Sequence, residues 1–451
     1  MRKSIIFLIL LFFTANISCS GDNEDVVSPL PPSFVKADTF PAVHSTTANA
    51  GFSLGSDQLF TEKYFHLVDG KKVAIMANIT AKKTVDRLID NPRVELVAIF
   101  GPEHGFFGKT AAGLAIDDTV YRGVPVYGCY GGGDETRRIP FNLLEYIDVL
   151  LFEVQDIGAR YYTFISSMYL AMDSAADANI PFVVLDRPNA AGGDNLEGPM
   201  LEPAYQSFLG VGNFPIRYSM TIGEMALMFC GETELMHGPR YPRKNPADKY
   251  FNIKDLSLTI VPMTGYDRTL LWDEVMQGEP WVSTSPNIPG VMSALCFAGT
   301  GIMAGNTIDE IVKGFQQFQV LSFPFVNSRE EMTAFITEAK KHYAFPGVSL
   351  SQAVHPETFA ENIVVLEVYD PHVFKPVESS LALMYTQRVL YPDERFLTNE
   401  KAEELTQKVV GNDWLLSMLL SEILPPFSAI LERIKAETEP FLAIRKKYLL
   451  Y

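Results

Sequence analysis

Four short runs of apolar residues, each without alternating polar positions, limit most strongly what this chain can fold into. Continuous hydrophobicity is expected of a strand when helices cover both faces of its sheet. The segment 164–179 carries apolar residues at helical spacing and ends just before Pro181, as a crossover helix would. The chain is therefore predicted to form an α/β fold with a Rossmann-like parallel sheet. The four runs are residues 71–78, 94–100, 147–154 and 180–186.

The length of the chain points to a second, smaller domain. With 451 residues and 47% hydrophobic content, two domains are a better expectation than one. We assign residues 51–298 to the Rossmann-like domain and residues 299–451 to a smaller α+β C-terminal domain. In the latter, the patterns predict helices over 307–318, 328–342 and 398–410, a strand within 361–370 and a long amphipathic C-terminal helix.

Residues 1–19 have the pattern of an export signal. Two basic residues precede an apolar stretch, Ile5 to Phe13, that is too short to span a bilayer comfortably. The stretch leads to Cys19, in a context that resembles a lipoprotein signal in which the cysteine is lipidated. Residues 20–50 are rich in Pro, Ser, Thr and Asp and are interpreted as a flexible tether. We expect an exported cell-envelope lipoprotein, periplasmic or surface-facing on the outer membrane, held to the membrane only by this anchor; a cleaved soluble form is the alternative.

Composition argues against several classes of partner. The formal net charge is −17, and the Lys and Arg residues are dispersed without basic runs, which disfavours nucleic acid. Cys129, Cys230 and Cys296 stand singly in apolar context, and the histidines lack the close helical spacing of a zinc site. We therefore expect no metal, no cofactor and no nucleic-acid partner.

Polar residues follow each of the four predicted strands. The carboxyl ends of parallel strands meet at one edge of a sheet, where ligands bind in folds of this class. Four loops carrying polar groups to that edge are a stronger signal than any single motif. The candidates are Asn78 after the first strand, Glu103 and His104 after the second, Asp156, Arg160 and Tyr162 after the third, and Arg187 and Asn189 after the fourth.

The stretch GPEHGFFGKT at residues 101–110 contains part of a phosphate-binding loop, but Glu103 stands where that loop needs its first glycine. A carboxylate there would also repel phosphates. The glycines instead predict a bent loop that exposes Glu103 and His104. Partial desolvation of Glu103 would favour the neutral acid, which can protonate a leaving oxygen; a helix cap or salt bridge is the alternative. For His104, orienting the loop through its ring nitrogens is favoured over catalysis.

The loop after the third predicted strand leaves several roles open. Asp156 can activate water, orient a substrate amide or stabilise positive charge, or it can simply cap a turn. Arg160 and Arg187 can each clamp a ligand carboxylate or brace the loops by pairing with Asp156 or Asp186, and bracing is favoured for Arg187. Of Tyr161 and Tyr162, one is expected to face the core and the other the cleft.

Residues 281–290, WVSTSPNIPG, form a proline-bounded loop with an aromatic residue and an amide. Trp281 and Asn287 are the kind of pair that suits a sugar ring. An ordinary packed loop is the alternative interpretation.

Several segments together resemble one known family. They are FGPEHGFFG, FEVQDIGARYYTF, VLDRPNAAGGDNLEGP, RYSMTIGEMA, PWVSTSPNIP and the terminal FLAIRKKYLLY, and they span about Gly51 to Tyr451. The resemblance is to the exo-β-N-acetylmuramidase family, glycoside hydrolase family 171, also described as DUF1343. It implies release of β-linked N-acetylmuramic acid from the non-reducing ends of peptidoglycan fragments, in a cleft between a Rossmann-like and a smaller domain. It also implies that Glu103 is the catalytic acid, and we assign the lactyl carboxylate of the sugar to Arg160.

The chain departs from that family in two places. Glu153 replaces an aspartate, and residues 299–310, GTGIMAGNTIDE, have Ala304 where the family has a glutamate. The favoured hypothesis is an exo-acting glycosidase for peptidoglycan-derived oligosaccharides or muropeptides. The alternative is a lipid-anchored muropeptide- or sugar-binding protein that has lost turnover. A nucleotide-dependent transferase is disfavoured by the broken phosphate loop and by the absence of GxGxxG after any predicted strand.

Overall fold

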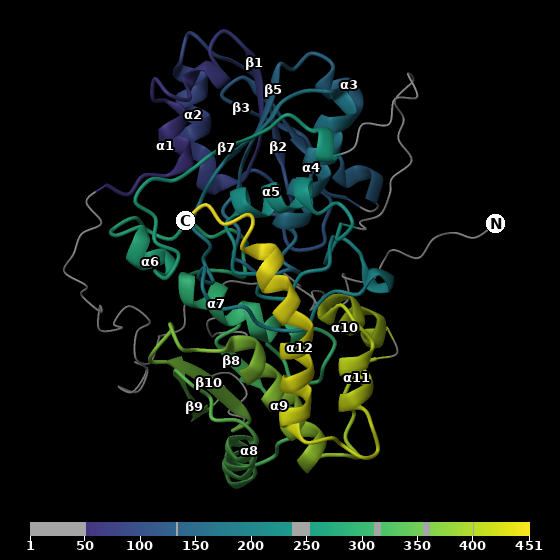
Figure 1. The fold of residues 1–451 in the computed structure, drawn as a ribbon. Coiled ribbons are helices and arrows are strands. Elements are labelled where there is room, and N and C mark those ends of the chain that lie inside the picture. Colours follow the sequence, from purple (N-terminus) through teal and green to yellow (C-terminus); the bar gives the residue numbers. More distant parts are fainter. Residues whose placement is uncertain (1–50, 132–133, 237–252, 311–316, 355–360, 400) are drawn as a thin grey trace, which may run out of the picture.

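The computed structural model describes residues 51–131, 134–236, 253–310, 317–354, 361–399 and 401–451 (Figure 1). The predicted signal, Cys19 and the tether lie outside these ranges. Among the described residues, no helix is both long enough and apolar enough to cross a membrane.

The centre of the larger part is a seven-stranded sheet in the order β3-β4-β2-β1-β5-β6-β7 (Figure 1). All neighbouring pairs are parallel except β3 and β4. The four predicted strands are confirmed, with slightly shorter bounds. The strands are β1 Lys72–Ala77, β2 Glu95–Gly101, β3 Thr119–Tyr121, β4 Val124–Gly128, β5 Val149–Glu153, β6 Phe182–Leu185 and β7 Leu258–Val261.

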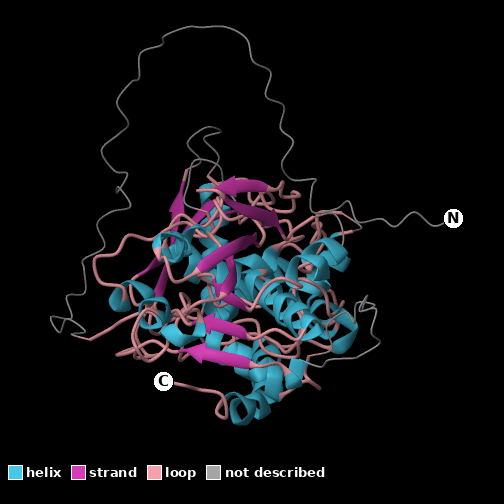
Figure 2. Cartoon of the chain, turned by 90° about the horizontal axis from the view of Figure 1, so that it is seen from above, coloured by secondary structure: helices cyan, strands magenta, loops and turns pink. Residues whose placement is uncertain are grey.

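Two separate hydrophobic cores explain the continuous apolar runs. In β1, Val73 and Ile75 contribute to the core that also holds Leu88 of α2. Ala74 and Met76, the alternate residues, contribute to the other and larger core. Each strand must therefore be apolar on both faces. Helices α1 Gly55–Leu59 and α2 Lys82–Asp90 supply the first core, and α3 Phe141–Leu144, α4 Phe164–Ala178 and α5 Ile222–Gly231 supply the second. Figure 2 shows helices, in cyan, packed around the magenta strands.

The smaller part contains a separate antiparallel sheet in the order β8-β10-β9. Its strands are β8 Val320–Ser322, β9 Val348–Ala353 and β10 Ile363–Val368. Helix α7 Val291–Thr300 packs against α9 Pro376–Leu390 and thereby links the two parts of the chain. The other helices are α6 Trp272–Val275, α8 Arg329–His342, α10 Ala402–Val410, α11 Trp414–Leu419 and α12 Phe427–Arg445, with short 3-10 helices at Phe65–Leu67, Ile79–Ala81, Asp134–Arg137, Pro203–Tyr205, Ile253–Asp255 and Gly301–Met303.

The predictions for the smaller part are mostly confirmed. Helices α8 and α12 and strand β10 lie where their patterns predicted them, and α10 begins at Ala402 rather than at 398. The helix predicted over 307–318 is wrong for residues 307–310, and residues 311–316 lie outside the described ranges. There Asn306 turns the chain by accepting from the Ile308 N–H, and Asp309 pairs with Ser322 of β8.

Buried arginines join the two parts through backbone carbonyl groups. Arg445, on α12, donates to the carbonyl oxygens of Ser219 and Gly193, so the C-terminal helix is bonded to loops of the sheet domain (Figure 1). Arg160 in turn reaches the last carbonyl groups of α10. We infer that the smaller part is fixed firmly on the larger one.

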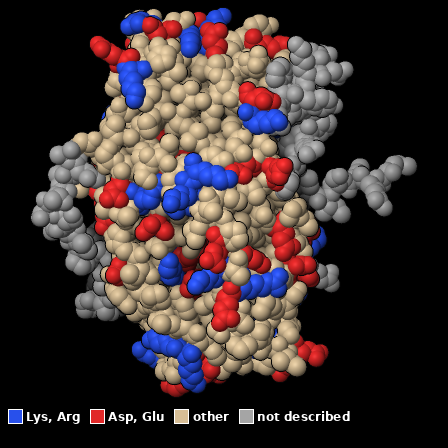
Figure 3. Space-filling model, viewed as in Figure 1, with Lys and Arg blue, Asp and Glu red and all other residues tan. Residues whose placement is uncertain are grey.

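The surface does not gather charge of one sign on the face seen in Figure 3, where acidic and basic side chains are interspersed. Many of them form ion pairs across short distances. Arg122, for example, contacts both Asp86 and Asp90.

Candidate active site

The carboxyl ends of β1 and β5 form the point where the sheet changes direction. From β1 the chain leaves through α2 on one face, and from β5 it leaves through α4 on the other, which opens a crevice between the two strand ends. The loops meet there directly, since the Gln155 N–H donates to the Thr80 hydroxyl at 3.2 Å. Asn78 caps the first of these loops by accepting from the Thr80 N–H. Its amide nitrogen is buried and has no hydrogen-bond partner within the described ranges.

Glu103 lies in the loop after β2, and only 7% of it is exposed. One carboxyl oxygen accepts from the Gly113 N–H at 3.0 Å, and the other is 2.5 Å from the Thr163 hydroxyl at the start of α4. Two causes raise the pKa of Tyr130 above its usual range: burial, which is the larger, and the nearby negative charge of Glu103. Both oxygens of Glu103 are therefore held in place by neighbours that can form hydrogen bonds.

His104 orients the bent loop, as the favoured interpretation predicted. Its ring Nδ1 is 2.7 Å from the carbonyl oxygen of Thr110, and its ring packs edge-on against Phe164. The carbonyl can only accept, so Nδ1 is the donor in this contact. His104 and Gly105 both have positive φ, at 70° and 74°, which makes the sharp bend that brings Glu103 to the end of the strand.

Asp156 has an unusual pattern of hydrogen bonds. Its Oδ2 accepts from the Gly158 N–H at 2.7 Å and from the Tyr218 hydroxyl. Its Oδ1 is buried and, among the described residues, has no partner. Burial raises the pKa of Asp156 to about 6, while the bond from Tyr218 opposes that rise. One oxygen of this carboxyl group is therefore buried without a donor among the described residues.

The two tyrosines after β5 contact different elements. Tyr161 donates to the carbonyl oxygens of Phe297 and Ala298 on α7, both at 2.9 Å, and so belongs to the core. The Tyr162 hydroxyl is 2.7 Å from the Thr284 hydroxyl, in the loop that follows Trp281. Tyr162 therefore links the loop after β5 to the 281–290 loop.

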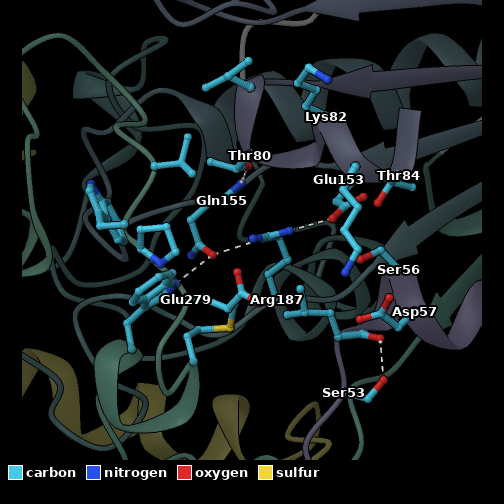
Figure 4. A pocket seen from close by; sticks show the side chains of 18 of the residues that line it. Ser53, Ser56, Asp57, Thr80, Lys82, Thr84, Glu153, Gln155, Arg187 and Glu279 are labelled. Carbon is cyan, nitrogen blue, oxygen red and sulfur yellow. Dashed lines mark hydrogen bonds and ion pairs between the residues drawn. The ribbon is translucent and has the colours of Figure 1, made fainter. Parts of the chain in front are cut away.

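A cavity of about 870 Å³ opens at the same edge of the sheet (Figure 4). At its floor, Arg187 pairs with Glu153 at 2.6 Å and donates to the Gln155 side-chain oxygen at 3.1 Å. Trp272 donates to that same oxygen at 3.1 Å. The lining comes from five stretches of the chain: residues 52–57, the 79–90 segment with α2, Glu153 and Gln155, Arg187, and 272–282. Glu103, His104 and Asp156 are not lining residues of this cavity, although Asp156 directly follows the lining residue Gln155.

Two predicted ligand contacts are replaced by structural roles. Arg160 is fully buried and donates to four backbone carbonyl groups, so its assignment to a ligand carboxylate is wrong. Burial lowers the pKa of its guanidinium to about 9. Asn189 is likewise buried, with its amide bonded to the Met220 carbonyl and the Ala191 N–H.

Arg187 braces the site as predicted, but through a different partner. It pairs with Glu153 rather than with Asp156 or Asp186. Asp186 accepts instead from the hydroxyl groups of Thr221 and Tyr451.

Trp281 lines the cavity, and its indole N–H donates to the Ile288 carbonyl at 3.0 Å, which closes the 281–290 loop on itself. Asn287 is half-buried in that loop, and its backbone N–H donates to the Ser285 hydroxyl. Asn287 is not a lining residue of the cavity.

Most of the unusual 299–310 stretch is buried, although Asp309 is exposed. Gly299 sits against the backbone of Pro376, and Asn306 donates to the Phe396 carbonyl. None of these residues lines the cavity. The departure from the family pattern therefore lies outside this cavity.

Sequence reasoning missed Tyr218, Thr163, Trp272 and the bonding role of Gln155. Tyr218 contacts Asp156 from 62 positions along the chain; it lies in the segment RYSMTIGEMA that carries the family resemblance, but nothing in that segment gives this residue a role. The described residues contain no group of His, Cys, Asp and Glu side chains arranged to hold a metal ion.

Comparison with known sequences gives one consistent family. Residues 73–292 match the family model described as exo-beta-N-acetylmuramidase NamZ, N-terminal, and residues 295–451 match its C-terminal counterpart. The chain is 33% identical over 411 residues to the peptidoglycan beta-N-acetylmuramidase NamZ of Bacillus subtilis strain 168, covering 88% of this chain and 91% of that protein.

Solved structures share the fold. A DUF1343 family protein of Bacteroides fragilis, BF0371, superposes with a TM-score of 0.74 at 28% identity, covering 89% of this chain and 99% of that one. A second from the same organism, BF0379, has a TM-score of 0.60 at 23% identity, with the same coverage of both chains, and supports the fold alone.

Proposed function

Because the chain belongs to the NamZ exo-β-N-acetylmuramidase family and is thus a glycoside hydrolase, we propose that it removes β-linked N-acetylmuramic acid from the non-reducing ends of peptidoglycan fragments. The observation that carries the proposal is the pair of nearly buried carboxyl groups, Glu103 and Asp156, at the edge of the sheet. A glycosidase can use two such groups in different environments: one protonates the leaving oxygen, and the other orients the 2-acetamido group of the sugar, whose carbonyl oxygen attacks the anomeric carbon before water completes the hydrolysis.

Glu103 is proposed as the general acid that protonates the leaving oxygen. The Gly113 N–H fixes one of its oxygens, and the Thr163 hydroxyl contacts the other. A threonine hydroxyl can either accept or donate a hydrogen bond, so it can serve Glu103 both before and after the proton is transferred. The carboxyl group can then change its protonation state without a rearrangement of the loop.

Asp156 is proposed to orient the 2-acetamido group of the sugar. Its buried, unpaired Oδ1 can accept an amide N–H from the substrate. An unsatisfied buried acceptor costs about 1–3 kcal/mol, and a substrate that supplies the donor recovers part of that free energy. This role requires the ionised carboxylate, which is the form that only accepts hydrogen bonds.

Replacing Tyr218 by phenylalanine is expected to move the acidic limb of the pH–rate profile to higher pH. The Tyr218 hydroxyl donates to Asp156 and lowers its pKa, which burial has raised to about 6. Without that bond the pKa rises further, and the carboxylate forms only at higher pH. The measurement is kcat/KM for Tyr218→Phe and the parent enzyme across the acidic range. If the acidic limb of the pH–rate profile does not shift, the ionisation of Asp156 is not required for activity.

The proposed activity is tested with a chromogenic aryl β-N-acetylmuraminide and the matching β-N-acetylglucosaminide. Release from the first alone is expected, because only the first carries the lactyl group. Release from both would contradict the specificity for muramic acid. Release from neither, with N-acetylmuramic acid still binding, would favour the sugar-binding protein.

A further inference from the structure

The floor of the 870 Å³ cavity contains a hydrogen-bond acceptor that the protein leaves unused. Glu153 is only 1% exposed, and its Oε1 pairs with Arg187 at 2.6 Å. Its Oε2 is buried and has no partner among the described residues, although Glu153 lines the cavity (Figure 4). Buried carboxylate oxygens normally have a donor. A ligand in the cavity can supply one from a hydroxyl or an amide N–H.

The walls of the cavity favour a neutral ligand with an apolar face. Trp272 and Trp281 meet edge to face, with ring centroids 5.0 Å apart, and Met276 and Pro280 extend that wall. Aromatic rings present flat apolar surfaces of the kind that sugar rings stack on.

The basic residues of the cavity are largely neutralised. Three of the four that line it are paired with carboxylates: Arg187 with Glu153, Lys82 with Asp86 and Arg87 with Asp57. Little unpaired positive charge remains to hold an anion. The lining therefore suits a saccharide better than an acidic ligand.

The position of the cavity relates it to the carboxyl pair. Gln155 lines the cavity, and its amide donates both to the Asp156 carbonyl and to the Pro188 carbonyl, each at 2.8 Å. The backbone of Asp156 is thus joined to the cavity through Gln155. At about 870 Å³ the cavity is in the upper part of the usual range for ligand pockets, roughly 300–1,000 Å³, and has more room than one sugar ring needs.

We infer that this cavity binds the saccharide on the leaving side of the cleaved bond, with a ring against Trp281 and a hydroxyl or acetamido N–H donating to Glu153 Oε2. The inference rests on the proposed function, because it takes the cleaved bond to lie at Glu103 and Asp156. An exo-acting enzyme releases one sugar and must hold the remaining chain elsewhere. The cavity provides that place.

The test compares two substrates: an aryl β-N-acetylmuraminide, and a disaccharide of N-acetylmuramic acid β-linked to N-acetylglucosamine. In Trp281→Ala, the ratio of kcat/KM for the disaccharide to that for the aryl compound is expected to fall about tenfold, the scale of losing one good apolar contact. Trp281→Phe should restore most of the ratio. The matched control is Trp414→Phe, on α11 and away from the cavity. This variant should leave the ratio of the two kcat/KM values unchanged. If the alanine variant does not fold, Trp281→Leu, which keeps apolar bulk without the aromatic face, takes its place.

Three outcomes would overturn the inference. An unchanged ratio would mean that the leaving sugar does not use the cavity. An equal loss for both substrates would place the released sugar there instead. A change seen only with fragments that carry a peptide would assign the cavity to the peptide stem.

Failure of the proposed function is distinguishable from failure of this inference. If the parent protein turns over neither substrate, the proposed activity fails, and the cavity is tested by titrating tryptophan fluorescence with the disaccharide. A saturable change that is lost in Trp281→Phe and kept in Trp414→Phe would support saccharide binding. If the disaccharide does not change the tryptophan fluorescence of the parent protein, the inference of saccharide binding in the cavity would be overturned.

Discussion

Replacing Glu103 by glutamine is expected to lower kcat by at least about a hundredfold, because an amide cannot donate the proton that the leaving oxygen needs. Glutamine has nearly the same shape and can still meet the Gly113 N–H and the Thr163 hydroxyl that hold Glu103 in place. Substrate affinity and stability should therefore change little. The measurement is kcat and KM with the aryl muraminide, together with the thermal midpoint of each protein.

The matched control for this variant is Glu95→Gln, at the exposed start of the same strand β2. It should leave kcat and the thermal midpoint unchanged. A purely structural glutamate at position 103 would instead give a lower midpoint with little specific loss of rate. That result would exclude Glu103 as the acid.

Replacing Arg160 by leucine is expected to lower the free energy of unfolding by at least about 3 kcal/mol. In the parent protein, the guanidinium of Arg160 donates to four buried carbonyl oxygens, and the substitution leaves these oxygens without a donor. They belong to Pro199, Phe214, Val409 and Val410. Each unsatisfied buried acceptor costs about 1–3 kcal/mol, so even partial relaxation leaves a large loss. Chemical denaturation of the parent and variant proteins measures it.

The control for Arg160→Leu is Arg93→Leu. The Arg93 side chain is 63% exposed and pairs with Asp69 at the surface, so its loss should cost no more than about 1 kcal/mol. If Arg160→Leu were as stable as the parent protein, the structural role assigned to Arg160 would be contradicted.

The strands of the sheet could be predicted to the extent that both of their faces are buried. Strands β1, β2, β5 and β6 lie between two cores and are continuously apolar. Strands β4 and β7 escaped prediction for a physical reason. In β4, Pro125 is exposed between two buried valines, and β7 is only partly buried along most of its length. Strands nearer the edges of a sheet carry a weaker apolar signal.

For the candidate site, the sequence predicted which loops meet but not what each side chain does there. Glu103, Asp156 and Arg187 could be found because they follow buried strands directly. The role of Arg160 could not be foreseen, since its partners on α10 lie about 250 positions further along the chain. Tyr218 was missed for the same reason.

The arginine bonds between the two parts of the protein have a consequence for how the sequence can drift over evolutionary time. Arg160 and Arg445 bind backbone oxygens of the opposite part, which every amino acid carries. The residues that supply those oxygens can be exchanged for others without loss of the bond, provided that the backbone keeps its course. Relatives are therefore expected to exchange one apolar residue for another at positions 409 and 410 more freely than they replace Arg160. Positions 193 and 219 are more restricted, because Gly193 lies close against Arg268 and Ser219 has a positive φ.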